Sequence, residues 1–475
     1  MHGQTRTLLL CLGLAAAHAI SAAESELDSV LQGFDEPAGS AADVSNEPSL
    51  DAVLGGFEEG ITAVEDSKAA SNEKKPWQFG GSITLGMAYN YAHEAPASGE
   101  TDYRGLSRLR GKLNLELDAD LPRNWRAHVA GNGFYDAAYQ LNGRDDYTDA
   151  VLDDYESEAE LGEAWVQGRL NHQTDLKLGR QIVVWGKSDN IRITDIINPL
   201  DNREPGMVDI EDLRLPLTMA RLDYYFGDWG ISAMAIPEIR FNKNPPYGSD
   251  FFPATSPLPT EQIPGDGDGN TEYAVAANGI FSGWDLSLYW AQHFDDTAHL
   301  VTSAGVPQLQ HNRLTMTGLA ANVAVDNWLF KGETAHFSSL SYASLPNETL
   351  SRIDTLLGVE YAGFRETTLS LEIANRHIIG YDNAVSAEGI VEDEWQTALR
   401  YQGDFMHARL HLLALVSAFG EDLNDGGFGR YSVAYDLADA LTVTGGIVSY
   451  EGGNHIPFSA IANNDRLFLD IKYSF

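Results

Sequence analysis

The chain has 475 residues, 43% of them hydrophobic, and a formal net charge of −38 at pH 7. So acidic a surface repels phosphate, which excludes nucleic acid as an expected partner. The single cysteine, Cys11, lies in a segment that we expect to be removed, so the mature chain has no thiol for a disulfide or a thiolate metal site.

Residues 1–23 have the layout of a secretory signal peptide. Arg6 precedes the apolar run "LLLCLGLAAAHA", and the small residues Ser21 and Ala23 precede the expected cleavage site. After this segment no run is long and apolar enough for a membrane helix. Membrane strands remain possible, because their alternating residues give little hydropathy signal; the mean hydropathy of the chain is −0.24.

Residues 24–75 form an acidic segment rich in alanine and serine, which predicts a mostly disordered periplasmic arm. Within it, "LDSVLQGFDE" at residues 27–36 is nearly repeated as "LDAVLGGFEE" at residues 50–59. The apolar residues of both decamers have the i, i+3, i+4, i+7 spacing of a short amphipathic helix: Leu27, Val30, Leu31 and Phe34, then Leu50, Val53, Leu54 and Phe57.

Each of these helices is too short to be stable alone, so it needs a surface to bind. Two copies on one tether predict docking on a periplasmic or inner-membrane transporter partner, where the second copy adds avidity. Two alternatives stay open: both helices plug the inner mouth of the chain's own barrel, or they pair with each other.

Residues 76–475 show the alternation of membrane strands. The chain ends in "RLFLDIKYSF", where every second residue from Leu467 to Phe475 is apolar. In lipid all backbone polar groups must pair internally, so such strands close into a barrel with an apolar outer face and a wet lumen. The terminal Phe475 resembles the C-terminal signal of bacterial outer-membrane barrels, which implies the barrel-assembly machinery, outer-membrane lipid and lipopolysaccharide as partners. An edge strand of a secreted sandwich is the alternative.

Short turns alternate with long polar loops, as in outer-membrane barrels. Trp125, Trp229, Trp284 and Trp328 each follow a short turn, and Trp77 opens the first strand. Because amphipathic rings prefer the headgroup level of a bilayer, these residues predict an aromatic girdle on the periplasmic side.

We predict an all-β fold: a transmembrane, antiparallel, up-and-down barrel of about eighteen strands, with sixteen as the alternative. The strand at 217–227 is the least certain. The predicted strands are 77–92, 106–120, 124–138, 159–170, 174–184, 217–227, 230–242, 272–282, 284–294, 312–325, 328–339, 353–363, 366–377, 392–403, 405–418, 427–437, 440–450 and 465–475.

Residues 178–200, "LGRQIVVWGKSDNIRITDIINPL", resemble an uncharacterised family of proteobacterial outer-membrane barrels. The resemblance rests on Gly179, Arg180, Gln181, Trp185, Gly186, Asn198 and Pro199, and extends to Pro205, Gly206, Leu215, Pro216 and the two decamers. Members of that family are often encoded beside transporters of the resistance-nodulation-division type. The resemblance therefore implies the outer component of a multi-protein route for an apolar or amphipathic molecule, and it supplies no catalytic residues.

The stretch from Trp185 to Leu215 is too long for a routine turn. It predicts a helix from Ser188 or Asp189 to the residue before Pro199, folded into the lumen and narrowing it. An ordinary outer loop on the rim is the alternative. By strand parity Arg180 should face lipid, unless a bulge beside Gly179 turns it inward or its side chain reaches the interface.

The candidate residues of the lumen and its constriction are polar or conformationally special side chains on these segments. Arg108, Arg110, Lys112 and Arg126 form a basic patch that either steers an anion or pairs across strands. The constriction candidates are Arg180, Gln181, Trp185, Lys187, Asp189, Asn198 and Pro199. A passive diffusion porin is the main alternative function and an outer-membrane enzyme a weaker one, and we expect no cofactor and no metal.

Overall fold

The computed structural model describes residues 76–475, apart from residues 98, 209, 268 and 304. The expected signal peptide (1–23) and the arm (24–75) with both decamers lie outside the described residues. Leu27, Val30, Leu31, Phe34, Leu50, Val53, Leu54 and Phe57 are therefore not placed, and their docking role stays a prediction.

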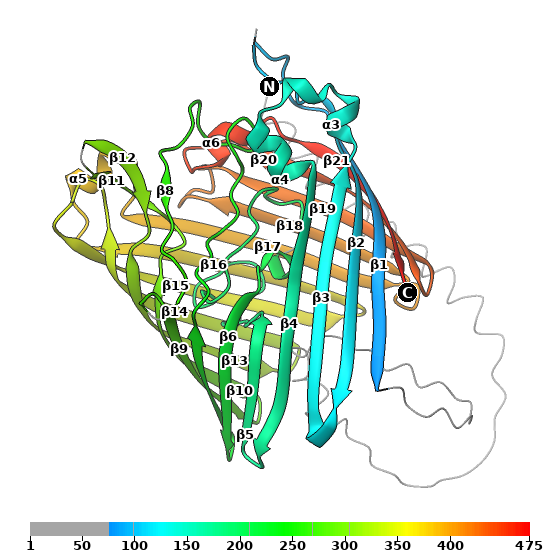
Figure 1. Ribbon diagram of the computed structural model, residues 1–475, viewed down its shortest axis with the longest axis vertical. Coiled ribbons are helices and arrows are strands. Elements are labelled where there is room, and N and C mark those ends of the chain that lie inside the picture. The colour runs from blue at the N-terminus through cyan, green and yellow to red at the C-terminus, as the bar shows by residue number, and fades with distance from the viewer. Residues whose placement is uncertain (1–75, 98, 209, 268, 304) are drawn as a thin grey trace. The chain divides into compact units, whose positions relative to one another are not determined.

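Eighteen antiparallel strands form one closed barrel (Figure 1). Each strand pairs with the next along the chain, and the last pairs with the first, with Tyr473 opposite Ile83. The barrel strands are Trp77–Asn90 (β1), Gly105–Leu121 (β2), Trp125–Asp136 (β3), Ser157–Asn171 (β4), Thr174–Gln181 (β5), Leu217–Phe226 (β6), Trp229–Ile236 (β7), Glu272–Phe281 (β9), Trp284–Phe294 (β10), Arg313–Val325 (β13), Trp328–Ser341 (β14), Thr349–Phe364 (β15), Thr367–Ile379 (β16), Asp393–Phe405 (β17), Leu410–Phe419 (β18), Gly427–Ala438 (β19), Leu441–Glu451 (β20) and Arg466–Ser474 (β21).

The strand prediction is confirmed in number and order, and the uncertain strand at 217–227 is β6. Alternation explains why: successive side chains of a strand point outward and inward in turn, and the outward ones are mostly apolar. On β15, for example, Leu357 is 70% exposed while the neighbouring Leu356 is buried inside the barrel. A water-soluble protein has no reason to expose the apolar side of every strand, whereas a barrel in lipid does.

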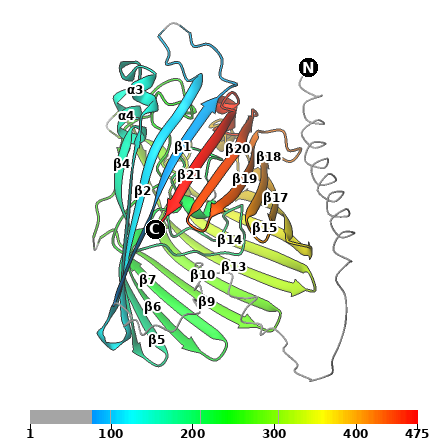
Figure 2. The ribbon, with the colours of Figure 1, turned by 90° about the vertical axis from the view of Figure 1, so that its right-hand side faces the viewer.

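The short connections lie at one end of the barrel and the long ones at the other. Trp77, Trp125, Trp229, Trp284 and Trp328 are each the first residue of a strand at the short-turn end, as predicted for a girdle. Figure 2 shows the tight turn between β6 and β7 at the opposite end from the helices α3 and α4 of the β3–β4 connection.

The long connections carry the remaining elements. Glu261–Gln262 (β8), His299–Ser303 (β11) and Val306–Gln310 (β12) form a small separate sheet. The α-helices are Ala138–Leu141 (α3), Asp149–Tyr155 (α4), Asn383–Ser386 (α5) and Phe458–Ile461 (α6), and the 3-10 helices are Pro122–Asn124 (η1), Arg144–Asp146 (η2) and Ile210–Leu213 (η3). Within the described part of the chain, no helix has the length and apolar character to cross a membrane.

Candidate functional site

The connection between β5 and β6 enters the barrel through a bulge at Gly179. Its φ is +124°, and an added Cβ would lie 2.3 Å from the carbonyl oxygen of Ala164. Only glycine fits this position. The bulge turns Arg180 inward, where its guanidinium pairs with Glu238 at 2.5 Å and Glu160 at 3.5 Å. Of the two orientations left open for Arg180, the structure therefore has the inward one.

Replacing Gly179 with alanine is expected to destabilise the folded barrel by about 1–3 kcal/mol from the positive φ alone. The clash with Ala164 adds to this loss. The measurement is the denaturant midpoint of the barrel refolded into lipid vesicles. Gly332→Ala is the matched control, because nothing lies within 4 Å of the Cβ that it would add on β14. Equal midpoints for the two variants would contradict the bulge.

Residues 182–208, which we call the strap, lie against the inner wall. The first part of the strap is apolar: Val183, Trp185, Ile191, Ile193 and Ile197 are buried in one core with wall residues of β6 to β17. The indole of Trp185 stacks on the ring of Tyr289 of β10, with ring centroids 4.7 Å apart. This half of the interior is therefore closed by apolar packing.

The helix predicted from Ser188 or Asp189 to the residue before Pro199 is wrong. The backbone there is irregular, because its N–H groups donate to wall carboxylates instead of to carbonyls one turn earlier. Glu333 of β14 accepts from the amides of Lys187 (2.5 Å), Ser188 (2.8 Å) and Thr194 (3.2 Å), and from the Thr194 hydroxyl (2.7 Å).

A second carboxylate, Glu372 of β16, holds the neighbouring part of the strap. It accepts from the Ser188 hydroxyl at 2.7 Å and from the amides of Asp189 and Asn190 at 3.0 and 3.1 Å. Glu333 is 3% exposed and Glu372 is fully buried. Hydrogen bonds to ionised groups are the strong ones, so these two carboxylates latch the strap to the wall.

Several predicted constriction residues meet at the base of the strap. Asn198 accepts from the amide of Val183 at 2.8 Å and donates to the carbonyl of Leu215 at 2.8 Å. Its amide also donates to the carbonyl of Gln181, and the carbonyl of Pro199 accepts from Leu215 at 2.7 Å. Asn198 therefore ties the entry and exit of the connection together.

The charged strap residues pair with the wall on the same side as the latch. The ammonium of Lys187 lies 2.5 Å from Asp285 of β10. Asp189 pairs with Lys331 of β14. Lys187 and Asp189 therefore each lie beside an opposite charge of the wall. These pairs orient the strap and leave little net charge in this part of the interior.

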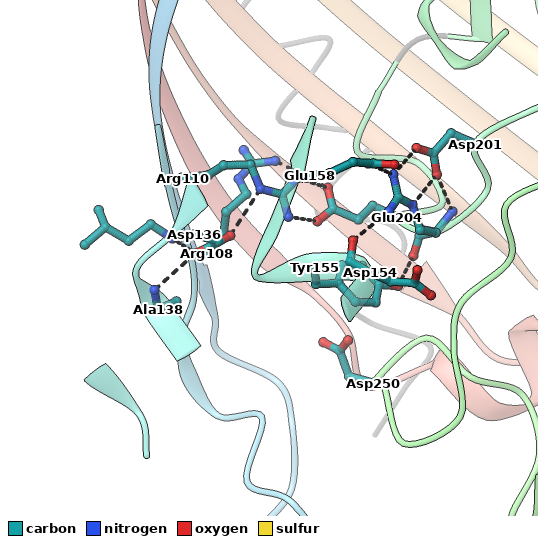
Figure 3. A network of polar contacts seen from close by, with 12 residues as sticks. Arg108, Arg110, Asp136, Ala138, Asp154, Tyr155, Glu158, Asp201, Glu204 and Asp250 are labelled. Carbon is teal, nitrogen blue, oxygen red and sulfur yellow. Dashed lines mark hydrogen bonds and ion pairs between the residues drawn. The ribbon is translucent and has the colours of Figure 1, made fainter. Parts of the chain in front are cut away.

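Residues 201–204 of the strap are polar, and Figure 3 shows Asp201 and Glu204 in a network with Arg110 of β2 and Glu158 of β4. Arg203 pairs with Asp201 at 2.6 Å and with Glu158 of β4 at 2.7 Å. Its carbonyl accepts from the hydroxyl of Tyr155 of α4 at 2.7 Å. These contacts fix the strap to the β4 side of the barrel.

Glu204 joins the strap to the predicted basic patch. Its carboxylate lies 2.9 Å from Arg110 and 3.7 Å from Arg108, both on β2. Burial raises the pKa of Glu204, but the attraction of Arg110, Arg108 and Arg466 outweighs burial and lowers this pKa to about 2. A depressed pKa contributes stability that is complete above the unfolded value and shrinks as pH falls toward the folded value. The contribution of this contact is therefore complete at neutral pH and is lost as pH falls toward about 2.

The four cations of the predicted basic patch therefore lie in different surroundings. Arg108 and Arg110 reach the strap, whereas Arg126 lies 78% exposed near the turn end of β3 and pairs loosely with Asp120 at 3.7 Å. Lys112 lies one inward position from Arg110 on β2, and its side chain is exposed. Sequence reasoning missed Glu204 and Glu333, since no local pattern distinguishes them from other acidic residues, and it placed Glu372 on the inner wall without its contact to the strap.

The strap covers the wall from β17 to β20 only in part. Leu415 of β18 packs against the apolar core, and Met207 of the strap lies in a second apolar cluster with Val448 and Tyr450 of β20. Between these contacts the inward side chains are half-buried, as Leu413, Ser432 and Thr444 show. The interior therefore has a large apolar core beside β6 to β17 and a less closely covered stretch of wall on β17 to β20, which we call the passage.

Comparisons with known proteins agree with this architecture. A family model described as a protein of unknown function, DUF1302, matches residues 7–475. The structure is similar to OccAB2 of Acinetobacter baumannii, with 12% identity and a TM-score of 0.50 over 84% of this chain and 98% of that one. It is also similar to OccK1 (OpdK) of Pseudomonas aeruginosa, with 11% identity and a TM-score of 0.48 over 84% and 98% of the two chains.

At 12% identity, the likeness to OccAB2 shows the fold alone. No curated protein matches the sequence.

Proposed function

The chain belongs to the DUF1302 family, and from this premise and its interior we propose that it is a channel of the Gram-negative outer membrane. Its cargo is an apolar or amphipathic molecule, and the channel is the outer component of a multi-protein route. The fold of an eighteen-stranded outer-membrane barrel supports the location. The interior supports the class of cargo.

One observation carries the proposal: the strap brings apolar and charged surfaces together inside one barrel. Apolar side chains of the strap and wall form a large core beside β6 to β17, while Arg108 and Arg110 of β2 lie in a charged cluster with Glu204. A general diffusion pore needs only a wet lumen, and an apolar core inside a barrel serves no purpose there. An interior with apolar and charged surfaces suits a molecule that has both.

The direct test is transport by the purified full-length chain in lipid vesicles. We expect entry of a probe with an apolar chain and a charged head to exceed entry of a sugar of similar size. Equal entry of both probes would instead support the passive diffusion porin. A barrel that passes neither probe, even after the contacts between strap and wall are weakened, would refute the channel function.

The partner part of the proposal rests on the two decamers of the sequence. Phe34→Ala combined with Phe57→Ala is expected to abolish capture of a periplasmic or inner-membrane partner in a pull-down, because each substitution removes the largest apolar side chain of a docking helix. Barrel assembly should not change. Gln32→Ala, on the polar face of the first decamer, is the control. Unchanged capture by the double variant would remove the docking role.

A further inference from the structure

The cations of the inner wall differ in whether a carboxylate neutralises them. Arg108 pairs with Asp470 at 3.1 Å, and Arg110 with Asp136 at 3.2 Å, in addition to their contacts with Glu204. Arg466 of β21 pairs with Asp250 at 2.9 Å. These three arginines hold the fold together and offer little free charge to a solute.

Arg400 of β17 is different. Strand pairing places it beside Ser370 of β16 and Leu415 of β18. Its guanidinium donates to Gln402 at 3.3 Å, and no carboxylate of the described residues lies within 4.0 Å of it. Its Nε is buried and has no hydrogen-bond partner in the described part of the chain. A guanidinium with unused donors is the group that binds a carboxylate or phosphate best.

Lys112 of β2 is a second such cation. Its side chain faces the interior beside Phe134 of β3, and within residues 76–475 as described no carboxylate comes within ion-pair distance. Asp201, Glu204 and Asp212 of the β5–β6 connection attract it from further away. Glu204 itself is engaged by Arg108 and Arg110, so it does not form an ion pair with Lys112.

Two carboxylates that could offset these cations are covered by the strap. Glu333 and Glu372 accept hydrogen bonds from the strap and are sealed beneath it. Glu372 is the diagonal cross-strand neighbour of Arg400, yet the two form no ion pair. Asp404 and Asp436 on the passage wall lie 2.6 and 3.2 Å from the ring nitrogens of His411. None of these four carboxylates therefore pairs with Arg400 or Lys112.

Apolar wall residues lie next to Arg400. Leu415 is its direct cross-strand neighbour, and Leu413 is the next inward residue of β18; both are half-buried. A cation beside an apolar surface matches a ligand with an anionic head and a hydrocarbon body. We propose that Arg400 of the passage and Lys112 of the neighbouring wall make the channel selective for amphipathic organic anions, which rests on the proposed channel function and names its substrate class.

The experiment measures ion selectivity and block in planar bilayers. The full-length chain carrying Glu333→Gln and Glu372→Gln, which we expect to release the strap, supplies the current. Reversal potentials in a KCl gradient give the anion preference. Hexanoate is the anionic probe, and hexyltrimethylammonium is a cation with the same hydrocarbon chain. Recovery of folded barrel after refolding shows that each variant is intact.

We expect an anion-selective current that hexanoate blocks and hexyltrimethylammonium does not. Adding Arg400→Gln and Lys112→Gln should shift the reversal potential toward cation preference and raise the half-blocking concentration of hexanoate roughly tenfold. Arg126→Gln removes the same charge from an exposed position at the turn end and should change neither value.

The possible outcomes distinguish the anion site from the channel function. A current that prefers cations, or block that does not depend on Arg400 and Lys112, overturns the anion site and leaves the channel standing. A folded barrel without any current overturns the channel, and the anion selectivity falls with it.

Discussion

Replacing both Glu333 and Glu372 with glutamine is expected to raise the conductance of the barrel. The two carboxylates accept seven hydrogen bonds from residues 187–194 of the strap. Glutamine keeps the shape but loses the charge, and its amide group faces donors that it cannot satisfy. If the change weakens seating of the strap by roughly 3 kcal/mol, the open population grows roughly a hundredfold.

Single-channel recordings in planar bilayers give the conductance, and hydrogen exchange of the 187–194 amides reports whether the strap has left the wall. Glu360→Gln is the matched control, since Glu360 of β15 contacts Lys331 at 3.3 Å and, within the described residues, forms no hydrogen bond with the strap backbone. Native conductance and native amide protection in the double variant would show that the two carboxylates do not latch the strap.

Placing a charge on the outer wall is expected to lower the stability of the barrel substantially. Leu357 lies in the middle of β15 and is 70% exposed. In a soluble protein Leu357→Arg would be harmless. In a barrel whose outer face meets hydrocarbon, arginine near the bilayer midplane costs about 2–4 kcal/mol.

Equilibrium unfolding in lipid vesicles measures this loss. The control is Val391→Arg, which puts the same charge at an exposed apolar residue of the β16–β17 connection, outside the strands. If Leu357→Arg is as stable as Val391→Arg, the outer face does not contact lipid, and the orientation of the whole barrel must be revised.

The strands could be predicted because their signal is local. Every second residue of a strand points to the same face, so the environment of each face appears in the sequence as a two-residue repeat of apolar or polar residues. β21 shows this best, with Leu467, Leu469 and Ile471 exposed on one face and Arg466 and Phe468 buried on the other. Tryptophans that follow short turns predicted where strands begin, and this pattern also involves only residues a few positions apart.

The strap was only partly predictable. Its length and the bulge at Gly179 suggested a segment turned into the barrel, and the structure has both. The predicted helix failed because side chains far along the chain compete for its backbone donors. A helical pattern in the local sequence cannot reveal a distant hydrogen-bond acceptor such as Glu372, which lies 184 residues from Ser188.

The sequence by itself thus determined the barrel: its strand number, the direction of its faces and the placement of its turns all follow from neighbours a few residues apart. Only the tertiary structure decided what fills the interior. Closing the ring brings β14 and β16 to the strap and sets Glu204, 94 residues from Arg110, against the basic patch. Which charges are neutralised and which stay open to a solute depends on that closure, because Coulomb interactions and hydrogen bonds follow distance in space and not along the chain.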